Sequence, residues 1–223
     1  QAVVGRGGML KPIASGVYQV NDAMKSDLYD HPIKEHASNL GGLIADDIAR
    51  ALPDAKAYIA DPVVVDELDE IARVSGHPLF KRISIFHALN QKSIARQHAK
   101  SIMKHYEDLN LIIVHMGGGI TIGAHQKGKV IDVNQGLDGE GPFSPERSGT
   151  LPSGDLVRFC FSGKYSEKEV LKMVVGNGGI VAYLGTNSAY EAEQRAQNGD
   201  EQAKFILEAL AYQVAKSIGS MVP

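Results

Sequence analysis

The sequence predicts an α/β protein with a mixed sheet. Three observations lead to this prediction: short apolar runs that end in glycines, amphipathic helical segments between them, and three apolar runs separated only by tight turns. Hydrophobic residues make up 43% of the 223 residues and charged residues 22%, as in an ordinary globular protein. A chain of this length can form one large domain or two small ones.

The residue pattern in the first part of the chain predicts two strands with a helix between them. Val3-Val4 followed by Gly5-Arg6-Gly7-Gly8 predicts a strand that leads into a tight, exposed loop placed for a ligand. Apolar and small residues at helical spacing predict an amphipathic helix over 39–52. Residues 57–61 predict a buried strand that ends in Asp61, and ligand sites in α/β proteins gather at such strand ends.

The middle of the chain predicts a helical crossover followed by a β-meander. Residues 66–106 predict mainly helix, most clearly from Ser84 to Tyr106. Tight turns, one of them Gly117-Gly118-Gly119, separate the next apolar runs. These runs predict three strands: 111–116, 120–124 and 130–133.

The last part of the chain predicts helices over about 154–161 and 166–174, with two more that begin near Ser188 and Asp200. Ser166 is a typical N-cap residue, followed by acidic residues in the first turn. The chain opens without an initiator Met and closes in a helical pattern. We therefore interpret it as the middle of a longer protein.

Composition and charge exclude several classes of function. Lys and Arg total 23 against 26 Asp and Glu, a formal net charge of -3, so no basic field would attract nucleic acid or an anionic membrane. No run approaches the roughly 20 apolar residues of a membrane span. The single cysteine, Cys160, cannot form an internal disulfide, which favours a reducing compartment. We expect a cytoplasmic protein without nucleic-acid or membrane partners.

The glycine turn and its neighbour are candidates for phosphate binding. Gly117, Gly118 and Gly119 carry no β-carbon, so their backbone N–H groups can approach an anion closely. A plain glycine hairpin is the alternative. His115, at the end of the preceding strand, is well placed to donate a hydrogen bond. No Gly-Lys-Ser/Thr follows, so this is not a P-loop.

Arg147 and His87 are candidates for contacting a reacting group. Arg147 lies in a turn-rich loop among acidic residues, where its planar guanidinium can bind a phosphoryl group or pair with Glu146 at the surface. Phe86 and His87 open a helix and combine an apolar wall with a proton-bearing donor. The alternative for His87 is a helix-face histidine that is satisfied locally.

Asp61, His36 and Asn39 could position a substrate, although Asn39 could instead cap the helix that follows it. Together, these candidates comprise a glycine turn that could bind phosphate, arginines in loops, and histidines. The sequence predicts no cysteine nucleophile and no metal cluster. This inventory suits phosphoryl transfer, in which catalysis is mostly positioning and charge stabilisation.

Seven segments carry a family resemblance: 2–8, 36–39, 60–66, 84–92, 115–119, 138–148 and 182–187. In this order they resemble the acetate and butyrate kinases of the actin-like ATPase superfamily, and most closely the butyrate kinase branch. The resemblance implies a ribonuclease H-like, duplicated two-domain fold with mixed sheets, here incomplete at both ends. It implies that 1–61 is part of an N-terminal acyl-site domain and 62–223 part of a C-terminal nucleotide-site domain.

The implied activity is reversible transfer of the ATP γ-phosphate to a short-chain carboxylate, with butyrate expected, giving butyryl phosphate and ADP. Mg²⁺ and a homo-oligomer are implied as well. Family segments that grip ATP and metal are absent, so we expect this chain alone to be inactive. Two alternatives stay open: a non-catalytic nucleotide-binding or interaction module of the same fold, and a sugar or glycerol kinase, whose hydroxyl acceptor needs a general base.

The resemblance also assigns roles. Arg147 matches the arginine that stabilises the phosphoryl group in flight, and His87 matches the histidine that shares this task. Asp61 matches the essential active-site aspartate. His36 matches a site histidine, and it is predicted to bind substrate together with two other residues, Asn39 and Phe86.

His115 and Gly117 to Gly119 match the second phosphate-binding loop of the family. Two departures stand out. Ala2 occupies the place of the arginine that binds the carboxylate in acetate kinases, so Arg6 is the nearest candidate for that role. Gly118 replaces an asparagine, so backbone contacts would have to serve there.

Overall fold

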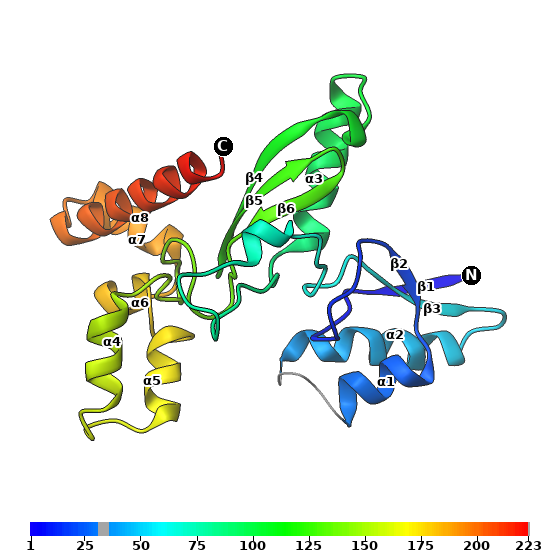
Figure 1. Cartoon of the computed structure of the whole chain (residues 1–223), viewed down its shortest axis with the longest axis horizontal. Coiled ribbons are helices and arrows are strands. Elements are labelled where there is room, and N and C mark those ends of the chain that lie inside the picture. The colour runs from blue at the N-terminus through cyan, green and yellow to red at the C-terminus, as the bar shows by residue number, and fades with distance from the viewer. Residues whose placement is uncertain (31–35, 223) are drawn as a thin grey trace. The chain divides into compact units, whose positions relative to one another are not determined.

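The computed structural model, drawn in Figure 1, describes residues 1–30 and 36–222. The chain divides into two compact units. Unit 1 comprises Gln1–Ile113 and Ala124–Val133, and unit 2 comprises Val114–Gly123 and Asn134–Pro223. Helices and strands alternate along much of the chain, so the prediction of an α/β protein is confirmed.

Unit 1 contains a mixed sheet of order β1-β3-β2, built from β1 (Ala2–Gly5), β2 (Val17–Gln19) and β3 (Lys56–Ala60). β1 runs parallel to β3, with Gly5 opposite Ile59, whereas β2 runs antiparallel to β3. Because β1 and β3 are parallel, their carboxyl ends meet at one edge of the sheet. The mixed sheet that the sequence predicts is therefore confirmed.

The predicted helix over 39–52 is confirmed as α2 (Leu40–Arg50), which packs against β1 and β3 beside α1 (Asp22–Tyr29) (Figure 1). α2 buries its small residues against the sheet: Gly42, Ala45 and Ala49. Its larger apolar residues are exposed: Leu40, Ile44 and Ile48. Small residues let the helix backbone approach the sheet closely, since a β-carbon on Gly5 would stand 2.2 Å from the carbonyl oxygen of Gly41.

The prediction of an exposed glycine loop after β1 is wrong for Gly7 and Gly8, which are buried. A β-carbon on Gly8 would stand 2.6 Å from Leu28 Cδ2 and 2.7 Å from Asn39 Cα. Gly7 has φ +76, a conformation that favours glycine. These glycines therefore serve close packing, and the exposed residue of this segment is Arg6.

The prediction of mainly helix over 66–106 is wrong for 66–87, where the chain forms the short 3₁₀ helix Glu70–Arg73 within irregular structure. Side-chain bonds to the backbone compete with helix here. The Asp66 carboxylate accepts the Leu68 N–H at 3.2 Å and Arg73 Nη1 at 2.7 Å. Arg73 Nη2 also donates to the Leu68 carbonyl at 3.1 Å. The predicted crossover helix is α3 (Ala88–Ser101).

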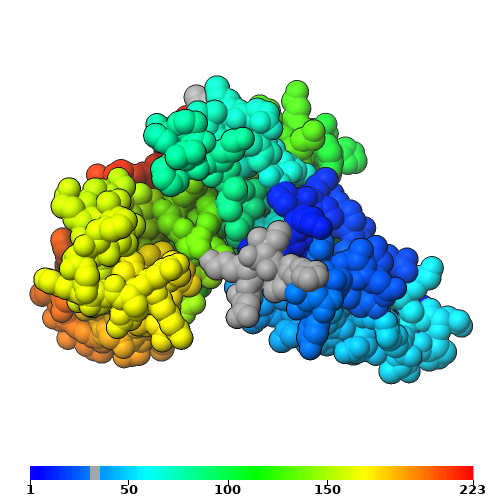
Figure 2. Space-filling model, turned by 60° about the horizontal axis from the view of Figure 1, so that its bottom comes forward, coloured from blue at the N-terminus to red at the C-terminus, as the bar shows by residue number. Residues whose placement is uncertain are grey.

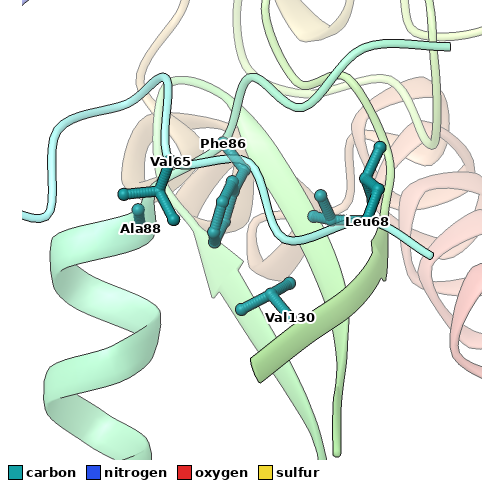
Figure 3. Packing of buried hydrophobic residues seen from close by; sticks show 6 residues of the cluster. Val65, Leu68, Phe86, Ala88 and Val130 are labelled. Atoms are coloured by element: carbon teal, nitrogen blue, oxygen red, sulfur yellow. The ribbon is translucent and has the colours of Figure 1, made fainter. Parts of the chain in front are cut away.

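The irregular segment and α3 share a hydrophobic core cluster in unit 1: Val65, Leu68, Phe86, Ala88, Val130 and Val133. Figure 3 shows the Phe86 ring among Val65, Ala88 and Val130. The exposed fraction of Phe86 is 2%. This packing anchors the start of α3 and the residue that precedes it, His87.

The predicted β-meander is confirmed as β4 (Asn110–Met116), β5 (Ile120–Gln126) and β6 (Lys129–Val133), in the order β4-β5-β6. Lys127 and Gly128 turn the chain between β5 and β6 with φ values of 49 and 86. Gly117 to Gly119 form the turn between β4 and β5, where Gly117 N–H donates to the Gly119 carbonyl at 3.1 Å.

Unit 2 is mainly helical: α4 (Ser153–Cys160), α5 (Glu167–Val174), α6 (Ile180–Leu184), α7 (Ala189–Gln197) and α8 (Glu201–Ser220). The predicted cap at Ser166 is confirmed, because Ser166 and Glu169 form a capping box. The predicted helix starts near Ser188 and Asp200 are confirmed as well, and both side chains accept a backbone N–H of their helix. The short elements β2, α1 and α6 have no clear sequence signal. Within the described residues, none of the helices is long and apolar enough to cross a membrane.

The paired helices α4 and α5 form a continuous patch of surface, coloured yellow-green to yellow in Figure 2. Val157 and Leu171 are exposed on these helices, and Phe161 is exposed directly after α4. The rings of Phe159 and Tyr165 stack with centroids 4.6 Å apart at the end of this hairpin.

Candidate active site

The predicted site residues divide between the two units. Unit 1 contains Arg6, His36, Asn39, Asp61, Phe86 and His87. Unit 2 contains His115, Gly117, Gly118, Gly119 and Arg147. Within each unit, the fold brings part of the predicted set together.

Arg6 and Asp61 lie at the same edge of the unit 1 sheet. Arg6 directly follows β1 and Asp61 directly follows β3, and these two strands are parallel neighbours. The carboxyl ends of parallel strands are the usual place for ligands in α/β proteins. Arg6 is exposed, and no described residue forms a hydrogen bond or ion pair with its guanidinium. A cation and a carboxylate thus lie at one edge.

Asp61 is held tightly in an unusual conformation. Its exposed fraction is 5%, and its φ of 38 lies in the left-handed region that few non-glycine residues adopt. Oδ1 accepts the Ser15 hydroxyl at 2.6 Å and the Gly16 N–H at 2.9 Å. Oδ2 accepts Arg96 Nη1 at 3.1 Å. Strained residues that their surroundings fix in this way are often found at functional sites.

Asn39 and His36 organise the loops near this edge. Asn39 is buried, and its Oδ1 accepts the Met9 N–H at 2.8 Å, so it ties the segment after β1 to the start of α2. Its side chain makes no capping bond to α2. His36 is exposed, and its Nδ1 lies 2.8 Å from the Ser38 hydroxyl. Direct substrate contact by either residue stays a prediction.

His87 and Phe86 precede α3 but face different surroundings. His87 is half-buried, and its side chain does not cap the helix. The Phe86 ring lies in the hydrophobic core cluster of unit 1. In the structure, Phe86 therefore fixes the position of His87, and its predicted contact with substrate stays a prediction.

A buried polar chain of Tyr106, His125 and Gln91 supports Arg96. The Arg96 guanidinium carbon lies 5.9 Å from the centroid of the Tyr106 ring. The Tyr106 hydroxyl lies 2.6 Å from His125 Nδ1, and His125 Nε2 lies 2.9 Å from Gln91 Oε1. These distances fit a neutral imidazole that accepts from Tyr106 and donates to Gln91.

Burial keeps the titratable side chains of this buried polar chain, His125 and Tyr106, in their neutral forms. It lowers the pKa of His125 to about 4, with the charge of Lys92 acting in the same direction. Burial also raises the pKa of Tyr106, and the charge of Glu67 adds to the effect. Both groups are therefore neutral at pH 7. Nearby, Lys92 is 1% exposed and pairs with Glu67 Oε2 at 2.7 Å.

In unit 2, the glycine turn lies against Arg147. A β-carbon on Gly119 would stand 2.2 Å from Arg147 Nη1 and 2.7 Å from its Cζ, so a side chain at this position would displace the guanidinium. A β-carbon on Gly117 would stand 2.9 Å from His115 Nε2. The Gly118 carbonyl accepts the Ser144 hydroxyl at 2.6 Å. The predicted phosphate-binding turn, its histidine and the predicted arginine therefore form one cluster.

The Arg147 guanidinium uses only part of its hydrogen-bonding capacity. Nη1 donates to the Gly136 carbonyl, whereas the buried Nε has no hydrogen-bond partner among the described residues. Burial lowers the pKa of Arg147, while the charges of Glu146 and Asp138 oppose this effect. Arginine nevertheless remains a cation near pH 7. A fixed cation with an unused donor beside a glycine turn is suited to a phosphoryl group.

The described residues offer no group of three or more His, Cys, Asp or Glu side chains that could hold a metal ion. Mg²⁺ is usually held by one or two carboxylates together with substrate phosphates. The requirement for Mg²⁺ therefore stays a prediction from the family resemblance.

Sequence reasoning missed Arg96, Ser15 and Ser144. Ser15 and Ser144 have no distinctive sequence signal. Arg96 lies four residues after Lys92, so the predicted helix places the two on one face, and this spacing is the signal that could have drawn attention to Arg96.

Solved structures share this fold at low sequence identity. The acetate kinase of Porphyromonas gingivalis matches with a TM-score of 0.83 and 19% identity, covering 99% of this chain and 58% of the other. A propionate kinase from Francisella tularensis matches with a TM-score of 0.80 and 22% identity, covering 98% and 59%. The acetate kinase of Entamoeba histolytica matches with a TM-score of 0.78 and 15% identity, covering 99% of this chain and 60% of the other. The chain thus has the actin-like ATPase fold of these carboxylate kinases.

Sequence comparison then identifies the family. The profile of the Acetokinase family matches residues 79–223. A curated relative, butyrate kinase 2 of Clostridium acetobutylicum, is 61% identical over 219 residues, which is 98% of this chain. The chain belongs to the Acetokinase family. It spans 61% of the length of that relative.

Proposed function

We propose that the protein containing this chain transfers the γ-phosphate of ATP reversibly to a short-chain carboxylate, with butyrate preferred, giving butyryl phosphate and ADP. The observation that carries the proposal is the cluster of Arg147 and the glycine turn in unit 2. Arg147 is a cation whose Nε donates to no described residue, and it lies against Gly119 of the turn; both features suit a phosphoryl group. The 61% identity to a protein named butyrate kinase 2 supports the choice of butyrate.

In the proposed reaction, a carboxylate oxygen of the acid attacks the γ-phosphorus in line, and the bond from phosphorus to the ADP oxygen breaks. Arg147 donates to the equatorial oxygens as charge develops there, and His87 shares this task. A carboxylate is already ionised near pH 7, so the nucleophile needs no general base. The lost charge on the acid reappears on ADP, and the reverse reaction follows the same path.

Asp61 orients groups at the acyl site in this proposal and does not act as a base. Its carboxylate already accepts three donors, Ser15, Gly16 and Arg96. A carboxylate has about four acceptor positions, so little capacity is left for abstracting a proton. This saturation argues against a sugar or glycerol kinase, whose hydroxyl acceptor needs a base.

The proposal includes the remaining expectations of the family resemblance. The acyl site belongs to the part of the chain over 1–61, with Arg6, His36 and Asn39 near the acid, and Phe86 contributes to substrate binding from the part over 62–223. The nucleotide site belongs to 62–223, with the His115 loop binding ATP or ADP phosphates. We further propose a cytoplasmic homo-oligomer that uses Mg²⁺, which light scattering and metal titration of the full-length protein would test.

The deciding experiment is an acyl-hydroxamate assay of the full-length protein with ATP, Mg²⁺ and acids from acetate to valerate, with glycerol as the control acceptor. A peak near butyrate is expected, since each buried methylene contributes about 0.8 kcal/mol, or about fourfold in kcat/KM. Transfer to glycerol alone would indicate a hydroxyl kinase. ATP binding without transfer to any acid would indicate a non-catalytic module and overturn the proposal.

A further inference from the structure

The Asp61 carboxylate is held from two directions within unit 1. The loop before β2 supplies Ser15 and Gly16, which both bind Oδ1. α3 supplies Arg96, which binds Oδ2 at 3.1 Å. Rotation about the bond between the β- and γ-carbons would weaken the contacts on both sides, and among the described residues Arg96 supplies the hydrogen bond that holds Oδ2 itself.

Arg96 is well suited to hold Oδ2 because it rests on a rigid support. Its side chain is 50% exposed, yet its guanidinium lies over the ring of Tyr106, which is 3% exposed. The hydroxyl of that ring is held by His125, and His125 is held by Gln91, both of them buried. A buried, fully connected polar chain of this kind restricts motion.

We propose that Arg96 is a positioning residue, which acts on the reaction by fixing the orientation of the Asp61 carboxylate. This inference rests on the proposed function. Arg96 itself touches neither the acid nor the phosphoryl group in this proposal. Loss of Arg96 therefore changes the turnover step and leaves the affinity for both substrates unchanged, since misplacing a catalytic group by about 1 Å can cost about 100-fold.

The test is a double-mutant cycle in the full-length protein with ATP and butyrate. We expect Arg96→Met to lower kcat by about 10- to 100-fold with unchanged KM for both substrates. In the Asp61→Asn background, the same substitution should cause no further loss, because its only route to the reaction is gone. Arg96→Lys should restore part of kcat. Arg158→Met is the matched control, since Arg158 is an exposed helix arginine paired with Asp155.

Two results would overturn the proposal. Additive losses in the cycle would mean that Arg96 acts independently of Asp61, and a raised KM for butyrate alone would mean that Arg96 binds the acid directly. Equal thermal unfolding temperatures of the wild type and Arg96→Met would exclude a merely structural loss. If those temperatures differ by more than a few degrees, the comparison is made with Arg96→Lys instead.

Failure of the proposed function is recognised separately, because the wild-type protein would then transfer phosphate to no acid. The positioning proposal is decided in that case by crystal structures of the wild type and Arg96→Met. We expect the Asp61 carboxylate to turn away from its wild-type orientation in the variant. An unchanged orientation would refute the role of Arg96 whatever the activity.

Discussion

The Arg147 guanidinium lies against Gly119 so closely that a β-carbon on Gly119 would stand 2.2 Å from Arg147 Nη1. This contact links the glycine at position 119 to the arginine at position 147. Glycine is required because any side chain would displace the cation, and the turn in return shields a guanidinium whose Nε is buried without a partner. The first predictions concern this pair.

Replacing Arg147 by Ala in the full-length protein should lower kcat by about 10³- to 10⁵-fold, the range for an arginine that stabilises a phosphoryl group in flight. The measurement is steady-state kinetics with ATP and butyrate. Arg158→Ala, which removes an exposed arginine, should leave kcat unchanged. A loss of less than tenfold in Arg147→Ala would refute the assigned role.

Replacing Gly119 by Ala should also lower kcat strongly, because the new methyl group and the guanidinium cannot occupy the same space. Gly76→Ala is the matched control, since nothing lies within 4 Å of a β-carbon there. Adding Gly119→Ala to Arg147→Ala should have little further effect on kcat. Full activity of Gly119→Ala would show that Arg147 does not need this position.

The buried His125 should make the free energy of unfolding depend on pH. Its pKa is lowered from 6.5 to about 4, so between these values the unfolded chain binds a proton that the folded protein does not. The stabilisation is complete above pH 6.5 and is lost as the pH falls toward 4, about 3 kcal/mol in total. Denaturant unfolding from pH 7 to 4 measures this slope.

In a His125→Gln variant, the free energy of unfolding should depend less steeply on pH between 7 and 4. This holds even if the variant is less stable than the wild type at every pH. His98→Gln is the control, because His98 is exposed on α3. An unchanged slope in His125→Gln would assign the pH dependence to other groups.

Removing one partner of the buried ion pair between Lys92 and Glu67 should strongly lower the free energy of unfolding. Lys92 Nζ also donates to the Gly128 carbonyl at 3.0 Å, and Glu67 Oε2 also accepts the Val130 N–H at 2.9 Å. Lys92→Met should therefore lower the free energy of unfolding by about 3–5 kcal/mol, because it leaves a buried carboxylate without its cation.

The double variant Lys92→Met with Glu67→Gln should recover part of that loss, since the uncompensated charge is gone. Lys11→Met is the comparison at the surface, where Lys11 pairs with Asp27 and is 76% exposed. This exposed pair should contribute less than about 1 kcal/mol. Equal losses in the two single variants would contradict the distinction, which denaturant unfolding would show.

Local patterns predicted most of the long elements. The helical spacing over 39–52, the cap at Ser166 and the three strands of the meander all follow from short-range chemistry, and all three predictions are confirmed. The prediction of helix failed over 66–87, and in the first part of this segment the Asp66 side chain bonds to Leu68 and Arg73 and competes with the helical backbone pattern. Whether such side-chain bonds win over helix is decided by tertiary packing.

The sequence by itself determined the α/β class, the order of elements and the motifs that mark the Acetokinase family. These features depend on periodicity and on residues close together in the chain. Only the tertiary structure decided that Arg96 holds Asp61, that Gly7 and Gly8 are buried, and that Gly119 lies against Arg147. Such contacts join residues far apart in sequence, and their geometry is set by how helices and sheets pack, which no local pattern encodes.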